Sequence, residues 1–305
     1  MHPKLDLVII RENEEDLYAG IEYRHTHNVR ESVKLISRTG CEKIVRYAFE
    51  YAVKNNRKKV TCFSKDNIMK FSDGIFHQVF NEIAKEYPAI SNEHYIVDIG
   101  TARLATKPEI FDVIVTSNLF GDIISDVTAE ISGSVGLAGS ANIGKDFALF
   151  EAIHGSAPDI AGKNIANPSG LLNAAIMMLG HLGFYEHATL IENAWLKALE
   201  DGMHTVDIQS PEYTEKVLGT REFGEAIIER LGQKPTSLIH DEENKKHLYF
   251  PKLPPLGIKP SAKQLVGVDV CIDKLTNDPR AIAEDLNQKL SSLLKLQFII
   301  SKGLV

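Results

Sequence analysis

Cysteine is scarce in this chain of 305 residues, which contains only Cys41, Cys62 and Cys271. Three widely separated cysteines argue against a disulfide framework, and none belongs to the C-x-x-C pair that is typical of a structural zinc site. Because free thiols persist under reducing conditions, this pattern predicts a protein of the cytoplasm.

The sequence also lacks an excess of positive charge and a long hydrophobic run. Its 34 lysines and arginines are outnumbered by 41 acidic residues, so no global basic field favours nucleic acid or an anionic membrane. The longest charge-poor stretch, residues 165–183, is interrupted by Asn167, Pro168, Asn173 and His181, so its continuous apolar core is too short to span a bilayer. No secretory signal is visible at the start. We therefore expect neither nucleic acid nor a membrane as a partner.

The remaining composition is typical of a globular protein that can bury a sizeable core, with 44% hydrophobic and 25% charged residues. β-type runs alternate with amphipathic helical stretches, which predicts an α/β fold. The expected strands are 5–10, 59–63, 94–97 and 113–116, and the expected helices are 42–55, 73–87, 122–132, 168–178 and 185–200.

Changes in composition predict four regions along the chain. They are residues 1–132, residues 133–232, a linker at 233–262 and a partial C-terminal α+β unit at 263–305. The linker holds five of the twelve prolines. In the last region we expect a strand at 265–273, a helix around 279–293 and a strand at 296–301.

The strongest local signal is NLFGDIISD at 118–126, where a buried strand is followed by a helix expected to begin near Gly121. Asp122 and Asp126 are four residues apart, so both carboxylates lie on one helical face. Paired hard oxygen ligands suit Mg²⁺ or Mn²⁺. The alternative is that Asp122 only complements the helix N-terminus and Asp126 is solvated. The position favours a ligand site, because crevices of α/β sheets open at the carboxyl ends of strands.

Arg11, Lys65 and Asp98 follow three other expected strands. The guanidinium of Arg11 can bind a carboxylate, the nearby Tyr18 hydroxyl can relay a proton, and Lys65 can act as a base near a cation. The alternatives are an ion pair of Arg11 with its acidic neighbours, a packing role for Tyr18 and an ordinary exposed lysine.

No G-x-G-x-x-G motif is present, so the sequence does not predict an ordinary Rossmann site. The segment HGSAPDIAGKNIANP at 154–168 instead has small residues that let the backbone approach a ligand. Asp159 in this segment could accept hydrogen bonds from ribose hydroxyls. The alternative is a turn-rich loop without a function.

Four motifs together resemble the β-decarboxylating dehydrogenases, the family of isocitrate, isopropylmalate and homoisocitrate dehydrogenases. They are RENEEDLYAGIE, SKDNIMKF, NLFGDIISD and HGSAPDIAGKNIANP, and the resemblance covers residues 5–231. It implies the isopropylmalate dehydrogenase-like three-layer α/β/α fold with large and small domains. In that fold, residues 1–132 would be the small substrate and dimer domain, and residues 133–232 part of the large domain. The YAGIE ending resembles isocitrate-using members, which implies oxidative decarboxylation of isocitrate to 2-oxoglutarate with NAD(P)⁺ in the citric acid cycle.

The resemblance also implies a role for individual residues in a homodimer that shares its active sites. Tyr18 is implied to protonate the enolate, and Lys65 to assist deprotonation of the substrate hydroxyl in the neighbouring subunit's site. Arg11 and Asn67 are implied to bind substrate. The implied metal ligands are Asp122 and Asp126, together with Asp98, which the other subunit supplies. The implied cofactor residues are His154, Gly155, Ala157, Asp159, Ile160 and Asn167.

Two other functions remain open within the resemblance. One is a homoisocitrate or isopropylmalate dehydrogenase, and the other is a non-catalytic regulatory subunit that keeps the fold. The presence of Tyr18, Lys65, Asp122 and Asp126 argues against the regulatory subunit, because such a chain has no chemical need for that set.

The chain departs from the family pattern in two places. Family members have an earlier segment with an S-x-N-x-x-x-R motif that nothing before Leu5 matches. The linker and LVGVDVCID resemble an extra C-terminal domain of a long bacterial subgroup whose members extend further, so we expect truncation at both ends. In addition, Ile99 and Gly100 follow Asp98 where the family usually has small or amide residues.

The cofactor preference is predicted from Asp159 and Ile160. NADP-using relatives resemble one another in having lysine at the first of these positions and tyrosine at the second. A carboxylate accepts hydrogen bonds from free ribose hydroxyls but repels a 2′-phosphate. The sequence therefore predicts NAD⁺, with NADP⁺ as the alternative if Lys163 reaches the phosphate.

Overall fold

The computed structural model describes residues 5–238, 249–252, 264–265, 267–268, 278–290 and 294–297, together with Val270, Ile272 and Ile299. The chain forms two compact units. Unit 1 comprises residues 1–19 and 34–259, and unit 2 comprises residues 20–33 and 260–305. The boundaries expected after residues 132, 232 and 262 stay predictions.

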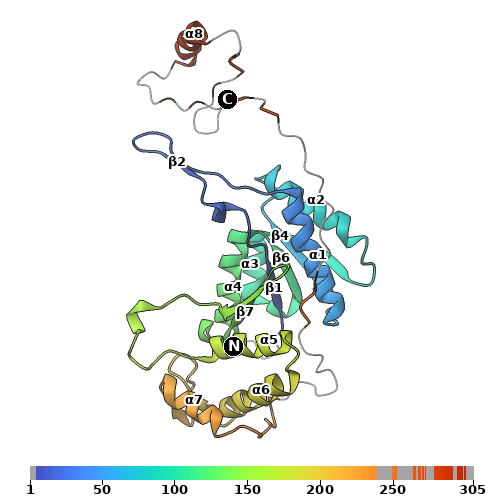
Figure 1. Ribbon diagram of the computed structural model, residues 1–305, viewed down its shortest axis with the longest axis vertical. Helices are drawn as coiled ribbons and strands as arrows, with labels where there is room; N and C mark the ends of the chain where they lie inside the picture. The colour runs from blue at the N-terminus through green and yellow to red at the C-terminus, as the bar shows by residue number, and fades with distance from the viewer. Residues whose placement is uncertain are drawn as a thin grey trace. The chain divides into compact units, whose positions relative to one another are not determined.

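A four-stranded parallel sheet lies at the centre of unit 1 (Figure 1). Its strands, in spatial order, are β1 (Val8–Arg11), β6 (Val113–Thr116), β4 (Lys59–Ser64) and β5 (Ser91–Ile96). The two central strands are buried along almost their whole length. Burial on both faces explains why these two segments are continuous apolar runs rather than alternating ones.

Helices cover both faces of this sheet (Figure 1). The helices α1 (Arg38–Lys54) and α2 (Ser72–Ala84) pack on one face, around a core that includes Phe49 and Phe80. The helices α3 (Val97–Thr106) and α4 (Asn118–Ser132) pack on the other, around Phe63, Leu104 and Ile124. The predicted α/β/α layering is confirmed.

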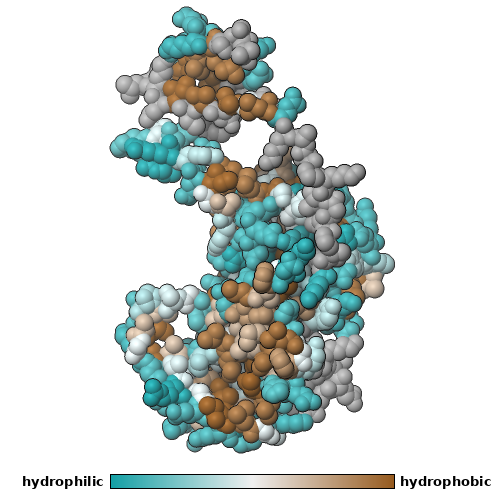
Figure 2. All heavy atoms as spheres, in the orientation of Figure 1, coloured by the Kyte–Doolittle hydropathy of each residue, from teal (hydrophilic) through white to brown (hydrophobic). Residues whose placement is uncertain are grey.

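The second half of unit 1 is mostly helical. An antiparallel pair, β7 (Gly139–Ile143) and β8 (Ala148–Ala152), packs against α5 (Ser169–His181). The helices α6 (Tyr185–Glu200) and α7 (Thr220–Ile228) share an apolar core with Phe223 at its centre. A short parallel pair, β9 (Met203–His204) and β10 (Lys216–Val217), lies in sequence between them. Figure 2 shows apolar side chains gathered on the surface in the part of unit 1 that holds α5 and α6.

Unit 2 contains an antiparallel hairpin of β2 (Glu22–Arg24) and β3 (Arg30–Ser32), and α8 (Pro279–Lys289). Asp278 caps α8 by accepting a hydrogen bond of 2.9 Å from the backbone N–H of Arg280. The helix expected around 279–293 is therefore present. Strands were also expected at 265–273 and 296–301. The residues described there, 265, 267–268, 270, 272, 296–297 and 299, lie in no strand, and the others lie outside the described residues.

Three features of unit 1 differ from the sequence-based expectation. α4 begins at Asn118, one turn before the expected start, because Ser117 already has extended N-cap geometry. α3 follows β5 directly, which places Asp98 in the first turn of a helix rather than at the end of a strand. The β7–β8 pair was not expected from the glycine-rich sequence at 133–144.

Cys41 and Cys62 are free and buried, and Cys271 lies outside the described residues. Burial raises the pKa of the Cys41 thiol to about 12, so the group stays protonated and unreactive near neutral pH. Over the part of the chain that the structure describes, no helix has both the length and the apolar character needed to cross a bilayer.

Candidate active site

An open cleft of about 1960 Å³ in unit 1 runs along the whole of β1, from Leu5 before the strand to Arg11 at its carboxyl end, and extends past α4 to the loop after β8. Several residues expected to bind substrate, metal or cofactor line this one cleft. They are Arg11, Tyr18, Asp122, Asp126, His154 and Gly155. The part of the cleft beside Arg11 lies at the carboxyl end of β1, where ligand crevices of α/β sheets open.

Arg11 is held in the cleft by α4. Its Nη1 lies 2.7 Å from Oδ1 of Asp122, and its Nε and Nη2 donate to Oδ1 of Asn118 at 3.0 and 2.7 Å. The guanidinium also lies over the ring of Tyr18, 4.9 Å from the centroid. These contacts fix the orientation of the guanidinium.

The ion pair of Arg11 with its acidic neighbours, the alternative considered above, is absent. Glu12 is buried and instead accepts hydrogen bonds from the backbone N–H groups of Glu14 (2.6 Å) and Glu15 (3.2 Å). Glu14 pairs with Lys43. Glu12 therefore stabilises the turn after β1, which leaves Arg11 directed at α4.

Gly121 makes the contact between Arg11 and α4 possible. A Cβ atom at this position would lie only 2.4 Å from Cγ of Arg11. Glycine inside a helix normally weakens it relative to alanine. Here the missing side chain lets the aliphatic stem of Arg11 pack directly on the helix.

Tyr18 is partly exposed above Arg11. Desolvation, and then interaction with the Asp122 carboxylate, raises the pKa of the Tyr18 phenol. The hydroxyl therefore keeps its proton near neutral pH, which is the state that an acid must be in before it donates.

Asp122 and Asp126 lie one turn apart on α4 and both line the cleft. Because α4 begins at Asn118, Asp122 is in the second turn and does not complement the helix N-terminus, so this half of the alternative is wrong. Asp126 is exposed, as the other half expects. Two carboxylates facing an open cleft are the donor set that Mg²⁺ or Mn²⁺ prefers, and these residues fit such an ion.

Lys65 and Asp98 form a separate pair, with Nζ of Lys65 3.0 Å from Oδ2 of Asp98. The hydrogen bond from Lys65 is the main reason that the pKa of Asp98 is lowered. Neither residue lines the cleft, and the exposed Asn67 does not line it either. The chain therefore does not bring Lys65, Asn67 and Asp98 together with Arg11 and Tyr18.

The three expected metal carboxylates also stay apart within one chain. Among the described residues, one group of three or more His, Cys, Asp or Glu side chains has its donor atoms within 4.8 Å of one another. This group contains none of Asp98, Asp122 and Asp126.

The expected cofactor segment is an exposed loop with an anchored end. His154, Gly155, Ala157 and Asp159 are exposed, and Ile160 is half-buried in a short 3₁₀ turn, Pro158–Ile160. Beyond this turn, the carbonyl of Asn164 accepts a hydrogen bond of 3.1 Å from the N–H of Thr220, at the start of α7.

Asn167 differs from the other cofactor residues because it is buried. Its Nδ2 donates to Oδ2 of Asp207 at 3.0 Å, and Ser134 and Thr205 also donate to that carboxylate. Burial acts to raise the pKa of Asp207, but these three donors together outweigh it and lower the pKa. Sequence reasoning did not identify Asp207 or the Asn118 that holds Arg11. Asn118 lies inside a recognised motif, whereas no local pattern marks Asp207.

Comparisons with known proteins match the chain to one family. The model of the isocitrate/isopropylmalate dehydrogenase family matches residues 1–227. The "Isocitrate dehydrogenase [NADP]" of Rickettsia bellii is 66% identical over 313 residues, which cover 100% of this chain and 63% of that protein. The chain thus spans about 63% of the length of that curated relative.

Two solved structures share the fold. The TT0538 protein from Thermus thermophilus is 42% identical with a TM-score of 0.78, over 93% of this chain and 57% of that one. The isocitrate dehydrogenase from Methylococcus capsulatus is 47% identical with a TM-score of 0.72, over 75% of this chain and 68% of that one.

Proposed function

Because the chain belongs to the isocitrate/isopropylmalate dehydrogenase family, we propose that the protein oxidises and decarboxylates isocitrate to 2-oxoglutarate and CO₂ with a nicotinamide dinucleotide. The observation that carries this proposal is the single cleft that Arg11, Tyr18, Asp122, Asp126 and the start of the cofactor loop line together. The place of this reaction is the citric acid cycle.

Each residue has a defined task in this proposal. Arg11, oriented by Asn118 and Asp122, binds a substrate carboxylate. Tyr18 donates its proton to the carbon that loses CO₂, and Lys65 takes the proton of the substrate hydroxyl. Asp122 and Asp126 would hold a divalent cation, which supplies Lewis-acid polarisation of the substrate oxygens.

We also propose that two copies of the chain share their active sites. Arg11, Tyr18 and Asp122 form one cluster, and the pair of Lys65 and Asp98 lies outside the cleft that this cluster lines. A homodimer in which Lys65, Asn67 and Asp98 of one subunit face the cleft of the other would supply both halves. This arrangement gives a third carboxylate to the metal.

For the cofactor we propose NADP⁺, the alternative to the NAD⁺ that Asp159 predicts. The relative that is 66% identical carries NADP in its name. Asp159 is exposed on its loop, where solvent weakens its repulsion of a 2′-phosphate without abolishing it. His154, Gly155, Ala157, Ile160 and Asn167 are the other proposed contacts of the dinucleotide.

Steady-state assays of the full-length protein with Mn²⁺ test both the substrate and the cofactor. We expect kcat/KM to be highest for isocitrate among isocitrate, homoisocitrate and isopropylmalate, and to be higher with NADP⁺ than with NAD⁺. Asp159→Asn should raise kcat/KM for NADP⁺ because it removes a repulsive carboxylate, whereas Asp146→Asn, in the β7–β8 turn, should not. Binding without turnover would identify a regulatory subunit, and better use of NAD⁺ would restore the prediction from Asp159.

Replacing Asp126 by asparagine should raise the Mn²⁺ concentration needed for half-maximal activity by about 10-fold to 100-fold, because an anionic ligand is lost at constant size. Metal titrations of activity measure this change. Glu130→Gln is the matched control, since Glu130 lies one turn further along α4 and is exposed but does not line the cleft. Equal metal requirements in the two variants would exclude Asp126 as a ligand.

A further inference from the structure

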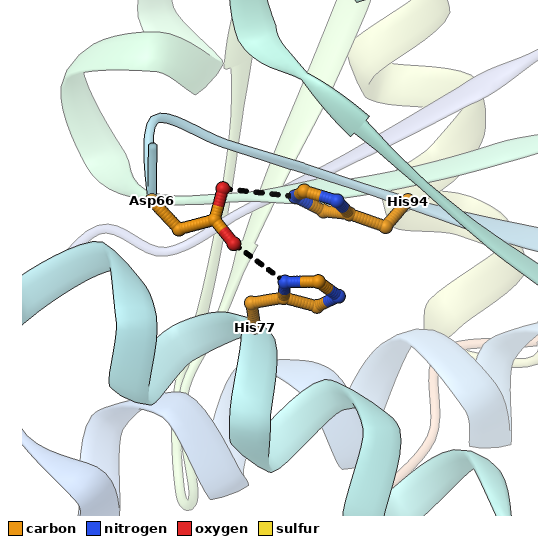
Figure 3. A group of neighbouring side chains, drawn as sticks. All are labelled: Asp66, His77 and His94. Carbon is orange, nitrogen blue, oxygen red and sulfur yellow. Dashed lines mark hydrogen bonds and ion pairs between the residues drawn. The ribbon is translucent and has the colours of Figure 1, made fainter. Parts of the chain in front are cut away.

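A cluster of metal-binding side chains lies outside the cleft. Asp66 belongs to the turn after β4, His77 to α2 and His94 to β5 (Figure 3). One donor atom from each lies within 4.8 Å of the other two, and no other such group occurs over the described residues. Three elements that are distant in sequence thus present two imidazoles and a carboxylate to one another.

The carboxylate of Asp66 faces both rings (Figure 3). Its Oδ2 lies 2.7 Å from Nδ1 of His77, and its Oδ1 lies 3.8 Å from Nε2 of His94. The two rings are stacked, with centroids 3.6 Å apart and planes 16° from parallel. The Oγ of Ser64 is a further neighbour, 2.8 Å from Nε2 of His94.

The cluster is partly buried and still accessible. Its side chains keep between 16% and 26% of their surface exposed. A small ion can enter from solvent without opening the fold.

We propose that Asp66, His77 and His94 bind a Zn²⁺ ion, with water or Ser64 as the fourth ligand. Two imidazoles and one carboxylate form a ligand set that favours Zn²⁺ over Mg²⁺. Zn–N and Zn–O bonds of about 2.1 Å place tetrahedral donors about 3.4 Å apart, so each donor needs to move by only about 1 Å. The rings must leave their parallel stack, because the lone pairs of parallel rings do not converge on one point.

The site has a consequence for Lys65, which immediately precedes Asp66. The N–H of Lys65 donates to Oδ2 of Asp73 at 2.6 Å, so this turn is already fixed on the α2 side. A Zn²⁺ ion on Asp66 would fix it on the β5 side as well. Metal binding is therefore coupled to the turn that carries Lys65.

Co²⁺ and Zn²⁺ binding to the metal-free protein, in excess Mg²⁺ to occupy the carboxylate sites, tests the proposal. We expect one Co²⁺ per chain with the intense visible bands of tetrahedral coordination, displaced by Zn²⁺. His77→Gln and His94→Gln should each weaken Zn²⁺ binding by about tenfold or more. The matched control is His25→Gln, since His25 pairs with Glu31 at 3.2 Å but does not belong to the three-residue cluster.

Absence of Co²⁺ bands, or equal Zn²⁺ affinity in the control and in both cluster variants, would overturn the site. Circular dichroism establishes whether each variant is folded. If a variant does not fold, X-ray absorption of the Zn²⁺-loaded unmodified protein decides: two imidazole ligands support the site, and fewer than two reject it. None of these measurements depends on dehydrogenase activity.

Discussion

Replacing Lys34 by methionine is expected to lower the free energy of unfolding by about 3–5 kcal/mol, because two buried carboxylates lose their only cationic partner among the described residues. Nζ of Lys34 lies 2.9 Å from Oδ1 of Asp73 and 3.5 Å from Oδ1 of Asp16. The side chains of Asp16 and Asp73 are 0% and 2% exposed, and that of Lys34 is 13% exposed. Urea unfolding followed by circular dichroism measures the loss.

Lys43→Met is the matched control for this substitution. Lys43 pairs with Glu14 on the surface, where the two side chains are 45% and 61% exposed. Exposed ion pairs contribute less than about 1 kcal/mol. The double variant Lys34→Met/Asp73→Asn should recover part of the loss, because one of the unpaired charges is removed. Equal stability of Lys34→Met and Lys43→Met would show that the buried pairs do not stabilise the fold.

The same ion cluster connects the elements that carry the candidate site. Asp73 accepts a hydrogen bond from the N–H of Lys65, and Asp16 accepts bonds from the N–H groups of Leu17 and Leu119. These contacts hold the Lys65 turn, the segment before Tyr18 and the start of α4 against one ammonium group. The positions of Tyr18, Lys65 and α4 are therefore coupled through Lys34, although Lys34 does not line the cleft.

Sequence reasoning predicted the parts of the site that depend on local pattern. The spacing of Asp122 and Asp126 correctly placed both on one face of α4, because the helical period alone determines that outcome. The apolar runs correctly placed β4 and β6 in the sheet, since both are buried on two faces. The position of Arg11 after β1 also followed from the strand pattern.

Long-range partners could not be predicted in the same way. Lys34 and Asp73 are far apart in the sequence, and no periodicity links a lone lysine to an acidic residue on another element. The same holds for Asp66, His77 and His94, which only the folding of β4, α2 and β5 brings together. The interval between β5 and β6 was not assigned as α3, because a glycine near its start and a proline just after its end obscure a helix of only 10 residues.

Two inactive variants are expected to restore activity when they are combined, if the active sites are shared. Tyr18→Phe and Lys65→Met should each reduce kcat by about 10²-fold to 10⁴-fold, because each removes one proton-transfer group. In a mixed dimer, the first chain supplies an intact Lys65 and the second an intact Tyr18, so one of the two sites contains both. Random association should therefore give about a quarter of the unmodified activity.

A second mixture provides the control for this result. Tyr18 and Asp122 both line the same cleft, so Tyr18→Phe combined with Asp122→Asn leaves no complete site in any dimer. That mixture should remain inactive, whereas the mixture of Tyr18→Phe with Lys65→Met should recover. The two halves are distinguishable because Lys65 contacts Asp98 and lies outside the cleft of its own chain. If both mixtures stay inactive although size-exclusion chromatography and mass spectrometry detect mixed dimers, Tyr18 and Lys65 act within one chain, and the shared-site proposal is wrong.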